Sequence, residues 1–369
     1  MEYPLLGVKW YAEGPFLREV VTSQTSKATR FYRVQPGQFI YNRMFAWKGA
    51  FGIVGNDLAG SYVSNEFPLF DCDRTRLLPE FLSLYFGQQA LWSYVARVST
   101  GTTASRSRWK ESQFNDHELA LPPVSQQSRI VDVMTAVDVQ IEAMKEEHQR
   151  SLSLRVALFL GAADLKDVAV EHVAHVSQGK TLTKSFQGVR TGEMSWFKIA
   201  DMAAPGNEDG YTRANTRMTL EQVESLNGAV VPAGSVVFPR VGAAVLTEKK
   251  RILNVDAAVD ENHLVLTPRE GVLSECLLAA IESIRLADLV QTGAVPSLNM
   301  GLIRHARIPW PAKPDAHLNA ALSQLRVATR DLREELSRLR TFRYALLTDL
   351  LNQEIDIPES YDALFSEVS

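Results

Sequence analysis

Two long heptad-patterned segments, each directly after a proline step, constrain this chain more than any other feature. The first segment is "LPPVSQQSRIVDVMTAVDVQIEAM", which begins at Leu121, and the second begins at Ile308 with "IPWPAKP". Steps of four and three residues place mostly apolar side chains on one line, from Ile130 to Leu158 and from Leu318 to Leu350. A narrow apolar seam of this kind favours a coiled-coil partner over a broad globular core.

Each seam is expected to be covered by the other, so that the two helices form an antiparallel coiled coil. Each helix would have roughly 37 residues and a length of ~55 Å, which matches about 16 base pairs of DNA. His148, Ser151 and Arg155 interrupt the first seam, which predicts fraying or a change of partner there. An amphipathic helix lying on its own domain is the alternative.

The segments that precede the two helices are also repeated. Gly37, Arg43 and Asn65 recur 197 positions later as Gly234, Arg240 and Asn262, and the loops "STGTTAS" and "QTGAVPS" follow in the same order. Pro-Gly turns leading into alternating apolar residues predict strands, and apolar helical segments follow them. The repeat predicts an α+β fold with two mixed α/β domains in a pseudo-twofold arrangement, separated by the two long helices. The expected boundaries are 1–123 for the first domain, 124–163 for the first long helix, 164–311 for the second domain, and 312–369 for the second long helix and C-terminal tail.

Composition and charge narrow the class of protein. With 369 residues and 46% hydrophobic content, each half can bury its own core. The sequence has neither an apolar run of 18 residues nor a secretory signal, so we expect a cytoplasmic protein without a membrane segment. Cys72 and Cys276 are expected to be reduced thiols. The net charge of −4 argues against a DNA binder that works by charge alone, but it allows basic residues concentrated on one face.

Basic residues with nearby Ser, Thr and Gly are the best candidates for contacts to DNA. "RVSTGTTASRSRWK" has four basic residues, no acid and several hydroxyls, which suit phosphate oxygens and guanine edges. A solvated loop is the alternative for this segment, and a structural arginine at a strand end is the alternative for Arg43 and Arg240. The candidate DNA-binding residues are Arg43, Lys48, Arg97, Thr100, Thr102, Arg106, Arg108, Lys110, Arg240, Lys249, Lys250, Arg251, Thr292 and Ser297.

Motifs for catalysis or metal binding are nearly absent. The sequence has no dinucleotide-binding fingerprint, no phosphate loop and no nucleophile elbow. His172 and His175 in "HVAH" lack a third ligand that would complete a metal motif. We therefore expect a recognition module without a catalytic site, a metal or a cofactor of its own.

The ordered motifs resemble those of the specificity subunit of type I restriction-modification systems. "LPPVSQQSRIVDVMTAVDVQIEAM" is similar to the family's conserved region, in which an apolar-Pro-Pro step precedes a helix that starts with Gln-x-x-Ile. "YRVQPGQFIYNRMFAWKGAFGIV" resembles the core of one target recognition domain. "SWFKIADM", "GSVVFPRVG" and "VPSLNMGLIRHARIPWP" resemble successive parts of a second.

The resemblance implies a non-catalytic reader of double-stranded DNA. Each recognition domain would read one half of a bipartite, asymmetric target, and the helices would set the spacer and dock two methyltransferase subunits. Restriction subunits that also translocate DNA would join for cleavage, and S-adenosylmethionine and ATP would belong to the partners.

One part of the pattern departs from this order. The segment that opens the second domain, from "DLKDVAVEHVAHVSQGK" to "WFKIADM", has no evident counterpart before Val34. Two other functions remain possible from the residues: a protein-binding scaffold with duplicated domains, and an enzyme with an unrecognised site.

Overall fold

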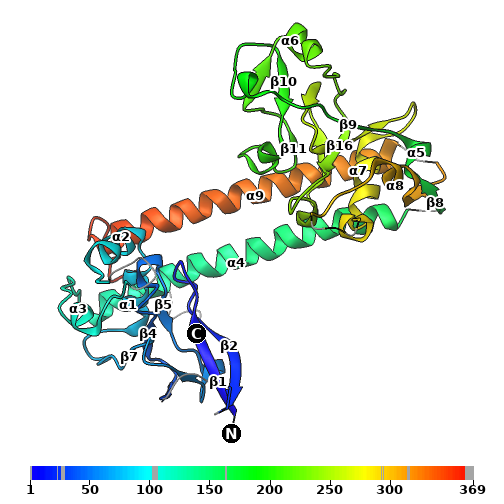
Figure 1. Cartoon of the computed structure of the whole chain (residues 1–369). Helices are drawn as coiled ribbons and strands as arrows, with labels where there is room; N and C mark the ends of the chain where they lie inside the picture. Colours follow the sequence, from blue (N-terminus) through cyan, green and yellow to red (C-terminus); the bar gives the residue numbers. More distant parts are fainter. Residues whose placement is uncertain are drawn as a thin grey trace. The chain divides into compact units, whose positions relative to one another are not determined.

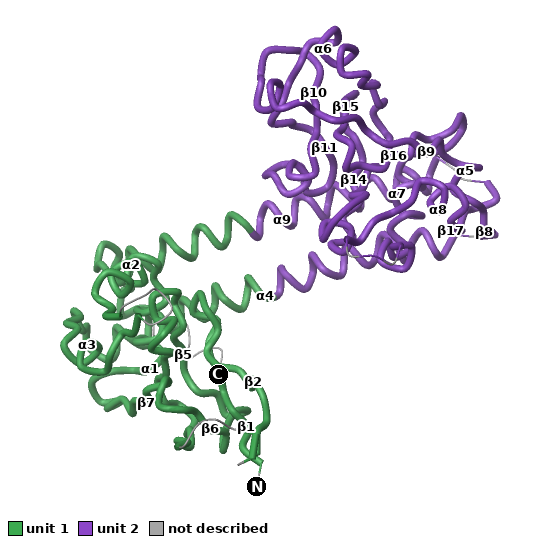
Figure 2. The backbone as a smooth tube through the Cα atoms, viewed as in Figure 1, with its two compact units in different colours: residues 1–142, 337–369 green, residues 143–336 purple. Residues whose placement is uncertain are grey.

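The computed structural model forms two compact units. Unit 1 comprises residues 1–142 and 337–369, and unit 2 comprises residues 143–336 (Figure 2). The structure describes residues 2–22, 24–25, 30–101, 107–162, 164–291, 293, 295–313 and 316–361. The predicted fold class is confirmed: both units mix strands and helices, and the two long helices are α4 (Val124–Leu160) and α9 (Ala316–Leu351) (Figure 1).

The long helices have 37 and 36 residues, close to the expected length. Each passes from one unit into the other, so that each compact unit is a domain together with the adjoining parts of both helices. Among the described residues, no helix is long and apolar enough to cross a membrane.

Unit 1 contains two sheets and short helices. One sheet has the strand order β2-β1-β6-β3, and the other has the order β5-β4-β7. The strands are β1 (Glu2–Val8), β2 (Pro15–Thr22), β3 (Tyr32–Arg33), β4 (Phe39–Tyr41), β5 (Phe51–Ile53), β6 (Tyr62–Val63) and β7 (Leu69–Phe70). The helices are α1 (Pro79–Phe86), α2 (Gln89–Val98) and α3 (Glu111–Asn115), with 3₁₀ turns η1 (Ala46–Lys48) and η2 (Asn56–Leu58).

Unit 2 is built around the sheet β11-β14-β13-β16-β9, with the smaller sheets β12-β10-β15 and β17-β8. Its strands are β8 (Leu165–Ala169), β9 (Ala174–Gln178), β10 (Met194–Phe197), β11 (Gly210–Tyr211), β12 (Thr216–Met218), β13 (Val236–Pro239), β14 (Arg251–Leu253), β15 (Ala257–Val259), β16 (His263–Pro268) and β17 (Arg307–Pro311). The helices are α5 (Val170–Val173), α6 (Leu220–Ser225), α7 (Ser274–Glu282) and α8 (Met300–His305), with 3₁₀ turns η4 (Lys184–Phe186), η5 (Ile199–Ala203), η6 (Val245–Thr247) and η7 (Leu286–Leu289).

The central strands of the two units follow one plan. In unit 1, β4 pairs antiparallel with β5 and β7, and in unit 2, β13 pairs antiparallel with β14 and β16. Gly37 and Gly234 precede these strands in the same left-handed conformation, with φ of 83° and 85°. Their amides donate to Val54 O and Leu253 O, both at 2.8 Å. Glycine is favoured at both positions because a side chain is strained at such φ values.

The Thr-Gly loops also close in the same way. Thr100 and Arg108 exchange backbone hydrogen bonds of 3.1 and 3.0 Å, and the amide of Gln291 donates to Ser297 O at 3.0 Å. The next residue in each unit, Trp109 or Leu298, donates its amide to the carbonyl of the strand-end arginine, Arg43 or Arg240. Each loop is therefore anchored to the end of its central strand.

The first strand of unit 1 corrects the sequence alignment. β1 pairs antiparallel with β2 and parallel with β6, and β10 likewise pairs antiparallel with β12 and parallel with β15. β1 therefore takes the place of β10, which contains part of "SWFKIADM", so this landmark does have a counterpart before Val34. The sequence did not reveal this counterpart because the two strands pair with their neighbours in the same way but have few residues in common.

The helix pair in unit 1 is antiparallel and has an apolar seam. Ile130, Met134, Leu347 and Leu350 are buried in one cluster. Gln126 contacts Asp356, five residues after the end of α9, and twelve residues further along α4 Asp138 pairs with Arg343 of α9, with Oδ2 and Nη2 at 2.7 Å. The partner numbers fall as the α4 numbers rise, which defines the antiparallel direction.

The helix pair in unit 2 has a more polar seam. Thr329 donates its hydroxyl to Ser151 Oγ at 3.0 Å, so the helices still contact each other at that level. Arg155, by contrast, is buried and pairs with Glu275 and Glu282 of α7. The predicted change of partner therefore occurs at Arg155. Burial at the end of α4 falls on Phe159 (0% exposed) and not on Leu158 (36% exposed), so that end of the predicted seam was wrong.

The Gln-x-x-Ile start of α4 ties the helix to the domain before it. Gln127 is fully buried; its Oε1 accepts from the amide of Leu78, and its Nε2 donates to Arg76 O and Pro122 O. Leu78 is the N-cap of α1, whose first amides have no partner within the helix. Asn319 of α9 does the same for α7, accepting from the amide of Glu275 at 3.1 Å.

Candidate nucleic-acid interface

Basic residues of unit 1 gather where the bridged pair Thr100 and Arg108 meets the end of β4. The carboxylate of Glu66 accepts from Arg108 Nε and Nη2 at 2.9 Å, and its backbone carbonyl accepts from the Arg43 amide at 3.0 Å. Glu66 raises the pKa of Arg108 above its ordinary value. Arg43 also pairs with Glu111, and its Nε is buried without a hydrogen-bond partner among the described residues. The carboxylates of Glu66 and Glu111 therefore orient the guanidinium groups of Arg108 and Arg43.

A small cavity adjoins this cluster. It has a volume of about 240 Å³ and is lined by Arg43, Asn65 and Glu111, together with Tyr32, Phe67, Pro68 and Leu69. Thr100 and Lys110 are exposed beside this cluster, and Lys110 is the N-cap of α3. The structure thus brings Arg43 together with Thr100, Arg108 and Lys110, which the sequence offered as separate candidates. Thr102, Arg106 and Thr292 lie outside the described residues.

Lys48 belongs to a second, aromatic patch of unit 1. Its ammonium lies 3.5 Å from the centroid of the Trp10 ring and 5.0 Å from that of Trp47, in cation–π geometry. Its carbonyl accepts from the amide of Tyr11 at 2.8 Å. Tyr11 is 63% exposed and Trp10 is 39% exposed. We name Trp10, Tyr11, Trp47 and Lys48 the aromatic–lysine patch.

The turn that presents this patch is conformationally unusual. Tyr11 and Ala12 both have left-handed backbone conformations, with φ of 60° and 58°. Non-glycine residues in this region are strained, and such strain concentrates at functional sites. Trp10 and Tyr11 were not among the candidates from sequence. The signal that could have identified them is two adjacent aromatic residues next to Lys9, in the otherwise polar and small segment "KWYAEG".

Arg97 lies at the exposed end of α2, over the ring of Tyr94 at 5.7 Å. In unit 2, Arg240 and Ser297 lie close together, because Val241 and Ser297 form a bridge and Arg240 O accepts from Leu298. Arg240 Nε donates to Glu261 O at 3.1 Å. The strand-end arginines therefore have the structural role that the sequence left open, with part of each side chain still accessible.

Lys250 is not placed as predicted. It is 7% exposed, and its ammonium donates to Ile284 O at 2.7 Å and to Glu248 at 3.0 Å. Burial lowers its pKa, and a buried ammonium engaged in this way has a structural role. Arg251 is also occupied, donating to Asn207 O and Lys250 O, whereas Lys249, which precedes them, is half-buried.

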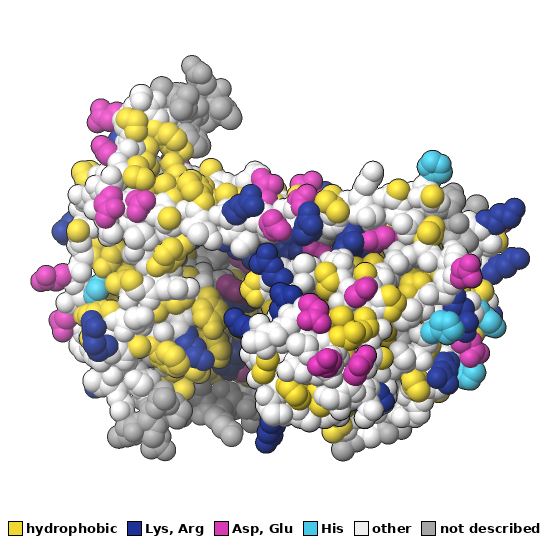
Figure 3. Space-filling view, turned by 90° about the horizontal axis from the view of Figure 1, so that it is seen from above, with side chains coloured by type: hydrophobic (Ala, Val, Ile, Leu, Met, Phe, Trp, Pro, Cys, Tyr) yellow, Lys and Arg dark blue, Asp and Glu magenta, His cyan; other side chains and the backbone are white. Residues whose placement is uncertain are grey.

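Charges are interspersed on the surface. On the face in Figure 3, Lys and Arg side chains lie next to Asp and Glu side chains on both units, consistent with the net charge of −4. Recognition of an anionic polymer would therefore depend on local groups such as the cluster of Arg43 and Arg108 and the aromatic–lysine patch, and less on an overall positive field.

One buried hydrogen-bonded chain has the composition of a catalytic relay. Asp260 contacts His263 Nδ1 at 2.7 Å, and His263 Nε2 contacts the Tyr211 hydroxyl at 2.8 Å. All three side chains are buried, and desolvation raises the pKa of Tyr211. A sealed tyrosine without substrate access is suited to joining β16 to β11 and not to catalysis. Among the described residues, no group of three His, Cys, Asp or Glu side chains could hold a metal ion.

Comparisons with known proteins connect this fold to one class. No protein-family model matches the chain. Over 126 residues it is 24% identical to the type I restriction enzyme HindI specificity subunit of Haemophilus influenzae, a match that covers 34% of this chain and only 28% of that protein's length.

Two solved structures share the fold over most of the chain. One, from work on complex assembly and conformational transition of the type I R-M system, aligns with a TM-score of 0.58 at 15% identity, covering 95% of this chain and 91% of that chain. The other, a type I restriction-modification S subunit from M. genitalium, gives a TM-score of 0.52 at 12% identity over 94% and 88% of the two chains. The resemblance to type I specificity subunits, carried by ordered sequence motifs, is thus confirmed by sequence over one segment and by fold over nearly the whole chain.

Proposed function

We propose that this chain is the DNA sequence-recognition subunit of a type I restriction-modification complex. The observation that carries the proposal is the duplicated unit. In each copy the end of the Thr-Gly loop is anchored to a strand-end arginine, through the amide of Trp109 or Leu298. Two similar readers in one chain suit a target with two half-sites. The relatives are themselves specificity subunits or belong to type I systems, which supports the assignment.

The proposed DNA-contacting groups are those that the fold leaves accessible. In unit 1 they are Thr100, Arg108 and Lys110, together with Arg43, Arg97 and Lys48. In unit 2 they are Arg240, Lys249 and Ser297. Lysine and arginine would contact phosphates, and arginine could also fork onto guanine. Thr102, Arg106 and Thr292 remain candidates from sequence.

The partners follow from the same proposal. The helix pair would set the spacer between the half-sites and dock two methyltransferase subunits, and restriction subunits would join for cleavage. This chain would be non-catalytic, with the methyl donor and the nucleotide bound by the partners. A target base would be flipped into the methyltransferase pocket.

Methylation specificity tests the proposal directly. The purified chain is combined with its methyltransferase partner, and methylated adenines are mapped on a random DNA library and on the host genome with and without the gene. Methylation confined to one split sequence is the expected result. Binding or methylation that ignores DNA sequence would contradict it.

Single charge removals test the residue assignments. Lys110→Gln should reduce the slope of log affinity against log salt by about 0.9, the contribution of one phosphate contact. Arg150→Gln is the matched control, because Arg150 is exposed on α4 and, among the described residues, pairs with Glu146 of the same helix. An equal change in both variants would refute the assignment of Lys110.

A protein-binding scaffold with duplicated domains is the alternative function. It predicts no retention on a DNA column at low salt, whereas the DNA reader should be retained and elute with a steep salt dependence.

A further inference from the structure

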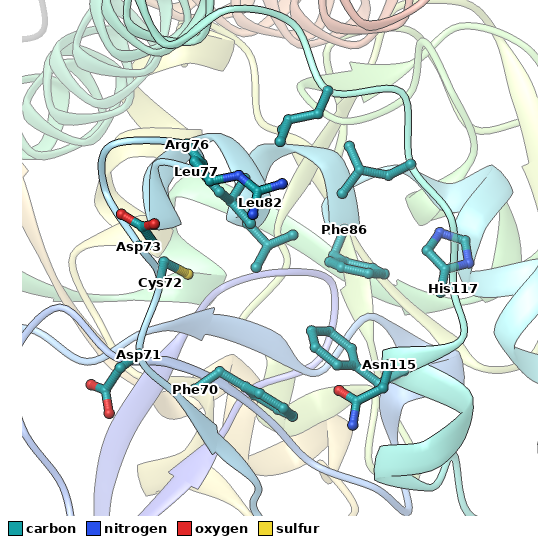
Figure 4. A pocket seen from close by; sticks show the side chains of 13 residues that line it. Phe70, Asp71, Cys72, Asp73, Arg76, Leu77, Leu82, Phe86, Asn115 and His117 are labelled. Carbon is teal, nitrogen blue, oxygen red and sulfur yellow. The ribbon is translucent and has the colours of Figure 1, made fainter.

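Unit 1 has an apolar groove beside the last strand of its central sheet. The groove has a volume of about 390 Å³, and the side chains of Phe70, Leu82 and Phe86 point into it from β7 and α1 (Figure 4). Leu77, Phe114, Leu119 and Leu121 complete the apolar lining, and Asp71, Cys72, Asp73, Arg76, Asn115 and His117 form its polar part. None of the proposed DNA contacts lies in it.

The internal repeat identifies the same place in unit 2. Phe70 of β7 pairs with Phe39, and Leu266 of β16 pairs with Val236, the residue 197 positions after Phe39. Phe70 and Leu266 therefore correspond.

The segment after α3 corresponds equally to the one after α8. The amide of His117 donates to Phe114 O, and that of Ala306 donates to Ile303 O, three residues back in both units. Counting on by two and by four residues, Leu119 corresponds to Ile308 and Leu121 to Trp310.

In unit 2 this place is filled by a strand–helix–strand segment, 165–178. Its first strand, β8, pairs antiparallel with β17, and its second strand, β9, pairs antiparallel with the outer edge of β16. Val170, Val173, Ala174 and Val176 of the segment are buried in one cluster with Leu266, Ile303 and Ile308.

In the described part of unit 1, no segment covers the corresponding surfaces. Among its described residues, no strand pairs with the outer edge of β7. Leu121 is 42% exposed where Trp310 is 8% exposed, and Leu119 is half-buried where Ile308 is fully buried. An apolar groove flanked by an open strand edge is suited to binding an added strand.

We propose that this groove is a docking site for a strand–helix–strand segment of a partner polypeptide, with the chemistry of residues 165–178. Its second strand would pair antiparallel with β7, and small β-branched residues at the positions of Val170, Val173 and Val176 would enter the groove. Asp71 lies at the register of Thr267, which faces His175 in unit 2. A lysine or arginine at the His175 position would therefore match the groove's charge. The proposal is independent of DNA recognition.

Cys72 reports on occupancy of the groove. It lies in the lining and is half-buried, whereas Cys276, the other cysteine, is fully buried in unit 2. The test adds a synthetic peptide with the sequence of residues 165–178, LKDVAVEHVAHVSQ, to the full chain and follows alkylation of Cys72. At a peptide concentration of ten times Kd, alkylation should slow about ten-fold. Cys276 should stay unreactive throughout, which shows that the fold is intact.

Matched variants make the result specific. Leu121→Glu, at an exposed position in the groove, should abolish protection by the peptide, whereas Leu17→Glu, at a 52% exposed position on β2, should leave it unchanged. A peptide with Val170→Asp and Val176→Asp should not protect. Absence of protection, equal protection by the altered peptide, or protection that arises from self-association of the chain and is lost on dilution would each overturn the proposal.

Discussion

Replacing Gln127 by leucine would remove the amide that joins the start of α4 to α1 while conserving most of the side-chain volume. Gln127 is 0% exposed, and its amide makes hydrogen bonds of 2.9, 2.8 and 2.8 Å to Leu78 N, Arg76 O and Pro122 O. Each such bond contributes about 1 kcal/mol net, and partners left buried and unpaired cost more than exposed ones. We therefore expect Gln127→Leu to lower the free energy of unfolding of unit 1 by about 3 kcal/mol.

The measurement has a global and a local part. Urea unfolding followed by tryptophan fluorescence gives the loss of stability. Hydrogen exchange of α1 gives the local effect: about 3 kcal/mol corresponds to roughly a hundred-fold faster opening of this helix. Gln126→Leu is the control, since the side-chain contact of Gln126 within the described part of the chain is a peripheral one of 3.4 Å with Asp356, and it should change stability by less than about 0.5 kcal/mol.

The reasoning fails if Gln127→Leu unfolds at the urea midpoint of the unaltered protein and α1 exchanges at an unchanged rate. A loss of stability without faster exchange in α1 would also count against it, because the cost would then arise elsewhere.

Three further replacements test the interior of unit 2. Arg155→Ala should destabilise the unit by about 3–5 kcal/mol in urea, because it leaves buried carboxylates short of a partner; burial lowers the pKa of Arg155 to about 10, still charged at neutral pH. An effect no larger than that of Arg150→Ala would refute this. His263→Phe should cost about 3 kcal/mol by breaking the Asp260–His263–Tyr211 chain, and an unchanged Tm would contradict it. Burial, with the nearby charge of Arg333, lowers the pKa of His148. As the pH falls, His148 is therefore protonated in the unfolded chain before it is protonated in the folded one, and the free energy of unfolding should decrease below about pH 6.5. His148→Gln should flatten this dependence. An unchanged pH profile would show that another group is responsible.

Patterns along the chain determined the main elements. The heptad spacing predicted both long helices because a coiled-coil seam has a fixed period that needs no knowledge of the rest of the fold. The repeat predicted the duplicated units because Gly37 and Gly234 meet the same backbone requirement, and that requirement selects one residue type. The Gln-x-x-Ile motif indicated the start of α4 without revealing what the amide binds.

The tertiary structure decided which residues of the same type lie on the surface, where they can bind, and which are buried in the interior. Lys249 and Lys250 are adjacent and chemically equal in sequence, yet Lys250 is buried against Ile284 O while Lys249 is half-buried. Trp10 and Lys48 form one patch only because a strained turn brings together residues far apart along the chain. The groove of unit 1 likewise arises from strand pairings present in one repeat and not in the described part of the other. Periodicity is a property of neighbours in sequence, whereas burial, ion pairing and open strand edges depend on contacts between distant segments.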